Sequence, residues 1–318
     1  TNIPSKQDEI FSSPSASIRY SKKNTTWYTS YNGSFSNFRI EGNNQKIIYP
    51  TNDSIRIIRS DSLRQENWSH KLHFGVDHFS NKKTQVSLYG FISGFSNEQD
   101  GQFKTVEISK TSGTKPYFLQ KDDLDKNHSA YISIYLKHRF NNTNMLTLEG
   151  NSYLLRSQTG LTLTGMERSF LQVSQSEPNM NKTNLRARFS SNISERVSLA
   201  LGIEEQWHSL QDNLLPSFKY SERIIAGYTQ GTLKLKPFHL QGGIRTEHSK
   251  VIYSDVLDEN RIFLLPQFDL KYNLNSKNSL KINYGKRINR PQNHQLNPNL
   301  YTIDPYTLQQ GNPELAPQ

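Results

Sequence analysis

Histidine, serine and acidic residues, which carry most catalysis and metal binding, are present in this sequence, but their spacing matches no reaction site. None of the nine histidines falls into H-E-x-x-H or a comparable metal-ligand spacing. His70, His73 and His78 lie close together, yet His70 and His73 would point to opposite faces of a strand. There is no cysteine, which excludes disulfides, thiolate metal sites and cysteine nucleophiles. We find no phosphate-binding loop and no serine nucleophile elbow, and so we expect neither an enzyme nor a bound cofactor or metal.

A second set of polar residues is more informative because it alternates with apolar residues. In VSLALGIEEQ, Val197, Leu199, Leu201 and Ile203 occupy every second position before Glu204. Successive side chains of a strand point to opposite faces, so this segment would have one apolar and one polar face. The same period of two, broken only at Tyr135, recurs at 132–139, 185–193, 264–273 and 280–287.

In a closed barrel the polar face would line the lumen and the apolar face would contact lipid. We expect Leu199, Leu201, Phe189, Leu270 and Ile282 to point outward. The residues expected to face the lumen are Lys137, Arg139, Arg186, Arg188, Glu204, Gln206, Arg245, Glu247, Gln267, Asp269, Lys281 and Arg287. They would contact a ligand path and a plug, or they would only hydrate the interior and pair with one another. For any single residue the second role is favoured.

The expected strands are joined by short turns rich in Asn, Ser, Lys and Pro. These turns are SKKNT, FSNKKT, FNNTNM, SNISER, KLKPFH and NLNSKN, and they predict twelve strands in six hairpins. The connections between hairpins are expected to be polar loops at 41–65, 96–128, 157–182, 209–220, 251–260 and 290–318. Alternate connections of an up-and-down meander lie at opposite ends, so one end would carry tight turns and the other long loops. That asymmetry, with Phe79, Phe140, Phe238 and Tyr272 beside the short turns as one aromatic girdle, is typical of outer-membrane β-barrels.

Composition agrees with strands that have one wet face. Only 33% of the chain is hydrophobic and the mean hydropathy is -0.75, yet 11% is aromatic, which argues against disorder. No run of about 18 apolar residues predicts a transmembrane helix, and residues 1–17, which lack the apolar core of a signal peptide, are expected to be irregular. The net charge is +10, but no five basic residues occur in a row, so no nucleic-acid partner is expected.

The stretch INYGKRINRPQNHQLNPNLYTIDPYTLQQGNPELAP resembles a signature of TonB-dependent receptor-like outer-membrane β-barrels, of the type abundant in Bacteroidota. The positions that carry the resemblance are Arg287, Arg290, Pro291, Leu296, Asn297, Pro298, Asp304, Gly311, Asn312, Pro313, Leu315 and Pro317. LHFGVDHFSNKKTQVSLYG is similar to a hairpin of the same family. The resemblance extends from about residue 18 to the end, and it implies that 18–318 is part of an antiparallel up-and-down transmembrane β-barrel domain with long extracellular loops.

The resemblance also implies a closed barrel of about 22 strands, so that the plug and the last strands are expected outside this chain. It implies the cell outer membrane as the location, contact with outer-membrane lipid, a periplasmic TonB-type energy coupler as partner, and uptake of a metal chelate, glycan or peptide.

Two alternatives remain open. In the first, the protein is a structural or assembly subunit of a larger outer-membrane complex without transport activity. Its loops, including YTIDPY at 301–306, would then bind other outer-membrane or surface proteins. In the second, it is a soluble secreted β-protein whose apolar faces pack sheet on sheet.

Overall fold

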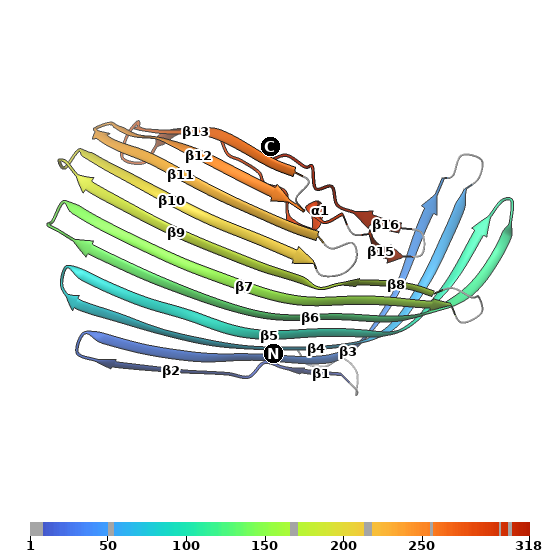
Figure 1. Cartoon of the computed structure of the whole chain (residues 1–318). Helices are drawn as coiled ribbons and strands as arrows, with labels where there is room; N and C mark the ends of the chain where they lie inside the picture. The colour runs from blue at the N-terminus through green and yellow to red at the C-terminus, as the bar shows by residue number, and fades with distance from the viewer. Residues whose placement is uncertain are drawn as a thin grey trace.

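The computed structural model describes residues 9–49, 54–165, 171–212, 218–254, 257–298, 300–304 and 307–318 (Figure 1). Almost all of them lie in β-strands. The strands are β1 Ile10–Ser12, β2 Ser15–Lys22, β3 Thr25–Ile48, β4 Ile55–Asn81, β5 Thr84–Ser109, β6 Gly113–Arg139, β7 Asn144–Gly165, β8 Leu171–Ser176, β9 Pro178–Asn192, β10 Val197–Asp212, β11 Phe218–Leu235, β12 Phe238–Tyr253, β13 Leu257–Asn273, β14 Ser279–Gly285, β15 Leu300–Asp304 and β16 Thr307–Gln310. The one helix that the described residues form, α1, is a single turn at Asn293–Leu296.

Strands β1 to β14 form one antiparallel sheet in which consecutive strand positions follow the order of the chain. Strands β1 and β2 lie end to end beside β3, and β8 and β9 lie end to end beside β7. The sheet therefore has twelve strand positions arranged as six hairpins, as the sequence predicts. Figure 1 shows it as a curved, open surface with the six short turns together at one end.

In the short turns, an Asn or Ser side chain accepts backbone hydrogen bonds that the carbonyl groups of a paired strand would otherwise accept. Asn81 Oδ1 accepts hydrogen bonds from the backbone N–H groups of Lys83 and Thr84, at 2.8 and 2.9 Å. Asn141 and Asn275 accept equivalent pairs of backbone hydrogen bonds, and Ser194 does so through Oγ. Asn and Ser can satisfy the backbone of a tight turn in this way, which explains why they occur where the hairpins reverse.

The prediction of long polar loops at the opposite end is wrong for most of their length. Strands β4 and β6 each contain 27 residues, and β5 contains 26, so they extend about 90 Å at ~3.3 Å per residue. They continue through most of 41–65 and 96–128, where only Lys110–Ser112 separates β5 from β6. Beyond the membrane the outer face of a strand no longer meets lipid, so the regular alternation of apolar and polar residues disappears although backbone pairing continues.

The strand register separates two faces over the whole sheet. Exposed apolar residues share the outer face, among them Leu72, Ile92, Ile134, Leu201 and Ile282. This face carries Trp27, Phe140, Phe238 and Tyr272 near the short turns, and Trp68, His70 and Tyr31 further along the strands. Phe79, expected in the near girdle, instead has the register of the inner face, paired with Gln85. An apolar outer face between aromatic residues is the arrangement of a membrane-spanning barrel wall.

The far ends of β4 to β7 bend and enclose a small core on the inner face. Leu63, Phe103, Tyr117, Leu119 and Leu163 are its buried members. Gly101, in β5, has a φ of +153°, and a Cβ there would lie 2.8 Å from Leu63 Cα. The absence of a side chain lets β5 approach β4 closely at the bend.

Two terminal segments differ from the sequence expectation. Pairing begins at Ile10, inside the segment expected to be irregular, while residues 1–8 lie outside the described residues. After β14 the chain turns onto the inner face of the sheet, where it forms α1 and the β15–β16 hairpin rather than a simple loop (Figure 1). We call the described part of 286–318 the inner segment.

Candidate functional site on the inner face

The expected lumen residues lie together on the inner face. The register places eleven of them there, and Arg287 follows the end of β14. Eight line one cavity of about 730 Å³ beneath the inner segment: Arg186, Arg188, Glu204, Arg245, Glu247, Gln267, Asp269 and Arg287. Gln206 lines a neighbouring cavity of about 660 Å³. Lys137, Arg139 and Lys281 share the face but line neither cavity.

An alternating series of carboxylates and guanidinium groups crosses four strands of this face. Glu204 receives Arg186 Nη2 at 3.0 Å and Arg245 Nη1 at 2.7 Å. Arg245 continues to Glu247, from Nε to Oε1, at 2.6 Å. Asn184 and Gln206 also donate to Glu204 Oε1. Ion pairs with this many hydrogen bonds offset the desolvation of buried carboxylates, which is otherwise unfavourable.

Arg290 extends this ion-pair network to the inner segment. Its Nη2 donates to Glu247 Oε2 at 2.7 Å and its Nε to Glu222 Oε1 at 3.0 Å. Both carboxylates are buried, and Glu222 also accepts hydrogen bonds from Ser249 and Tyr220. Burial opposes the charge of Arg290, but hydrogen bonds to Glu247 and the charges of both carboxylates raise its pKa above the ordinary value. Arg290 therefore anchors the inner segment to the sheet as a permanent cation.

Further contacts hold the rest of the inner segment. Leu296 is 3% exposed and packs with Leu210 and Phe218 of the sheet, while Asn297 Nδ2 donates to Asp212 at 3.2 Å. Within the segment, Gly311 N donates to Asn297 O at 2.9 Å and Asn312 N donates to Gln295 O at 2.6 Å.

Several residues of the resemblance motif thus hold the inner segment in place. Arg290 and Asn297 bind the sheet, and the Gly311–Asn312 peptide folds back on residues 295–297. Pro298 O accepts a hydrogen bond from Gln310, Pro291 lines the smaller cavity, and Pro313 lies in the following turn. Beyond the backbone of β15, YTIDPY lies outside the residues whose side chains are described.

An aromatic cluster on the inner face was not predicted from the sequence. Phe91 stacks on Tyr131 with ring centroids 5.4 Å apart, and Tyr153 lies beside Phe91. Lys71 Nζ lies 3.7 Å from the centroid of Phe91, which is cation–π geometry. Tyr135, the apparent exception to the alternation, also has the inner-face register. In YISIYLKHRF, Tyr131 and Tyr135 alternate with apolar residues at the positions expected to face the lumen. This spacing was the sequence signal that could have predicted aromatic residues on the inner face.

Glu222 was also missed. It lies in SERIIAGYTQG, where Glu222 shares its face with Ile224 and Ala226, while Arg223 lies on the outer face beside Ile225. Because polar and apolar residues mix on both faces of β11, the alternation does not show which of these residues lie on the inner face. The partner of Arg290 becomes evident only when the inner segment is placed.

These features define a class of protein. A sheet with an apolar outer face, short turns at one end and a charged, partly covered inner face is the wall of an outer-membrane β-barrel. Among the described residues, no three His, Asp or Glu side chains gather as ligands for a metal ion. No helix in the described ranges is long and apolar enough to cross a membrane.

Comparison with known proteins supports this class. Residues 176–318, from the end of β8 through the inner segment, match the model of the "Outer membrane protein beta-barrel family". The alcaligin outer-membrane receptor FauA of Bordetella pertussis is similar in structure, with a TM-score of 0.54 at 15% identity over 88% of this chain and 44% of that one. The ferric-catecholate import receptor Fiu of E. coli K12, in its closed form, has a TM-score of 0.56 at 12% identity over 90% of this chain and 50% of that one.

The chain therefore spans about half the length of these solved structures. No curated protein sequence matches it. The fold is all-β, antiparallel and up-and-down, and the family match together with this fold places the protein in the outer membrane.

Proposed function

We propose that the protein is a receptor of the outer membrane that takes up a nutrient in a TonB-dependent manner. The observation that carries this proposal is the charged inner face, opposite an apolar outer face in the same sheet. A polar lumen provides a path for a polar solute through the bilayer.

The inner face suggests the class of ligand. Arg188 and Arg287 line the larger cavity without a carboxylate within 4 Å among the described residues, so the cavity has cations available for an anionic ligand. FauA and Fiu are named as receptors for alcaligin and ferric catecholates. We therefore propose an anionic ferric chelate as the first ligand to test, before glycans and peptides.

In this proposal the inner segment controls the path of the ligand along the inner face. It lines both cavities through Arg290 and is held to the sheet beside them by Leu296. The ion pairs of Arg290 involve side chains only, so they can open without breaking the backbone pairing of the sheet. The proposed mechanism is capture of the ligand at the end opposite the short turns, followed by rearrangement inside the barrel that a periplasmic energy coupler drives.

Uptake measurements in cells test this function. The gene would be deleted, and accumulation of ferric catecholate chelates labelled with radioactive iron would be measured with and without an uncoupler of the inner membrane. The expected result is loss of accumulation in the deletion strain, its return on complementation, and its abolition by the uncoupler. Uptake that survives the uncoupler would indicate a passive channel. Unchanged uptake of chelates, glycans and peptides, with stable co-purification of partner proteins, would favour the structural subunit.

A further inference from the structure

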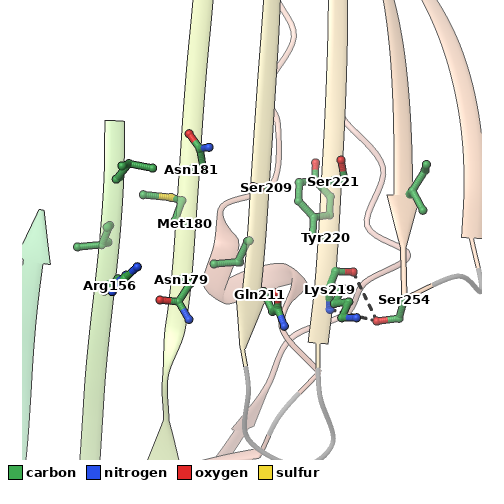
Figure 2. Close-up of a pocket in the computed structure, with 14 residues that line it drawn as sticks. Arg156, Asn179, Met180, Asn181, Ser209, Gln211, Lys219, Tyr220, Ser221 and Ser254 are labelled. Carbon is green, nitrogen blue, oxygen red and sulfur yellow. Dashed lines mark hydrogen bonds between the residues drawn. The ribbon is translucent and has the colours of Figure 1, made fainter. Parts of the chain in front are cut away.

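The outer face carries a groove that the uptake function does not use. Its cavity has a volume of about 500 Å³ and lies across β7, β9, β10, β11 and β12. Figure 2 shows Arg156 and Asn179 on one side, Lys219 and Ser254 on the other, and Gln211 between them. Arg156, Asn179, Gln211 and Lys219 are directly paired across neighbouring strands, so they form one row on the same face of the sheet.

The groove is cationic, and its cations are unmatched. On the same face, Arg223 pairs with Glu205, Lys126 with Glu98 and Lys250 with Asp258, at 2.5, 3.5 and 3.2 Å. Arg156 and Lys219 are exposed, and neither has a carboxylate within 4 Å among the residues that the structure describes. No described residue of the groove lining is acidic.

The next row towards the short turns is partly apolar. Leu154 and Ile252 lie there at its two ends and are 50% and 37% exposed. Between them, Asn181, Ser209 and Ser221 present an amide and two hydroxyls. The groove therefore has apolar residues in one row, two cations in the other, and neutral hydrogen-bonding groups between them along both rows.

The height of the groove corresponds to the headgroup region of a membrane. Ser209 lies twelve residues beyond Val197 in β10, which is about 40 Å along the strand, or roughly 30 Å of height at a tilt near 40°. The apolar band of an outer-membrane barrel is about 25 Å tall. The groove thus begins just beyond that band, at the end opposite the short turns, which is the cell-surface side of such barrels.

We propose that this groove binds the headgroup of a phosphorylated glycolipid from the surface leaflet of the outer membrane. Arg156 and Lys219 lie three strand spacings apart, about 14 Å, so they can contact two phosphate groups on one headgroup. Arg binds phosphate through two parallel N–H groups and Lys as a point charge. The Asn, Gln and Ser side chains between them suit sugar hydroxyls, and Leu154 and Ile252 suit the first carbons of acyl chains. The proposal depends on the outer-membrane fold and not on the identity of the transported nutrient.

Binding to purified protein tests the proposal directly. The protein would be extracted from outer membranes in detergent, and native mass spectrometry would measure binding of bis-phosphorylated lipid A, its monophosphorylated form, and inorganic phosphate. The variant Arg156→Gln with Lys219→Gln removes both cations. We expect the bis-phosphorylated form to bind this variant roughly 25-fold more weakly, since each of the two basic residues near an anionic surface contributes on the order of fivefold.

The matched control is Lys82→Gln with Lys83→Gln, which removes the same charge from a short turn at the opposite end. It should bind like the unmodified protein. Equal affinity of the unmodified protein and the Arg156/Lys219 variant would overturn the proposal. Complete displacement of the lipid by inorganic phosphate would also overturn it, because the site would then recognise free phosphate. Heat-modifiable migration in gels verifies that each variant is folded.

A second measurement needs no change in the groove. Trp207 lies on the outer face, paired with Arg223 one row below Ser221. In vesicles of phosphatidylcholine, the Trp207 signal is the fluorescence of the unmodified protein minus that of a Trp207→Phe variant. Lipid A labelled with a nitroxide at its headgroup should quench this signal at lower mole fractions than labelled phosphatidylcholine does. Equal quenching by the two labelled lipids would mean no preference for the glycolipid and would contradict the proposal.

Discussion

Arg290 donates a hydrogen bond from Nη2 to Oε2 of Glu247 at 2.7 Å, although the two residues are 43 positions apart in the chain. This contact joins the inner segment to β12, and the second contact of Arg290, with Glu222, joins it to β11. One guanidinium group therefore neutralises two buried carboxylates that belong to neighbouring strands. The position of the inner segment depends on electrostatics as well as on the packing of Leu296.

Arg290→Met should destabilise the folded protein. It leaves Glu222 and part of Glu247 buried without a cation, and breaking one partner of a buried ion pair costs roughly 3 kcal/mol. The measurement is the urea midpoint of unfolding in detergent or vesicles. Adding Glu222→Gln should recover part of the loss. Arg287→Met is the matched control because Arg287 is exposed and has no ion pair among the described residues; an equal loss in that control would contradict the assigned role.

Gly311→Ala should loosen the inner segment. A Cβ at this position would lie 2.7 Å from the backbone oxygen of Gln295 and closer still to that of Asn297, so the fold-back must shift at a cost of roughly 1–3 kcal/mol. Limited proteolysis of the folded protein should then cut within 286–318 faster. Gly285→Ala, where a Cβ meets nothing within 4 Å, should leave the cleavage rate unchanged.

The two faces of the sheet should respond differently to a change of charge. Leu201 is 46% exposed on the outer face, and an Arg near the bilayer midplane costs about 2–4 kcal/mol. Leu201→Arg should therefore reduce folding into vesicles, whereas Arg188→Leu on the inner face should be milder.

Cysteine scanning from 197 to 204 tests the orientation itself, because the chain has no native cysteine. A lipid-borne quencher should reduce the fluorescence of probes at odd positions and spare those at even positions. Equal quenching on both faces, or quenching on neither, would rule out a lipid-facing outer surface.

Leu163→Ala should destabilise the far end of the sheet. Leu163 is 1% exposed in the core that Leu63, Phe103 and Leu119 share, and such a truncation costs about 2–5 kcal/mol. Hydrogen exchange should accelerate in β4 to β7 beyond the membrane while the segments near the short turns stay protected. Leu171→Ala, at a residue that is 70% exposed, is the control; acceleration of equal size there would mean that the core contributes little.

The fold followed from the sequence wherever one face of a strand meets lipid and the other meets a polar lumen. In that region the period of two in β10, β13 and β14 and the Asn and Ser residues of the turns determine the strands, their pairing and the hairpin order, because each depends on neighbours in sequence. Eleven polar residues of the inner face follow for the same reason, since parity along a strand selects a face. Glu222 does not, because polar and apolar residues mix on both faces of β11.

Only the tertiary structure shows how the strands continue beyond the membrane-spanning region and what covers the inner face of the sheet. The far halves of β4 to β6 have no lipid-facing side and bury only a few apolar residues, such as Leu63 and Phe103. Their backbone pairing therefore left no regular period of two, and polar segments that were predicted to be loops are strands. The partners of Arg290 are 43 and 68 residues away, and Arg156 and Lys219 fall in one row only because β9 and β10 lie between them in register. Pairing between distant residues depends on how the sheet curves and where the inner segment folds back, and no local pattern of side chains contains that information.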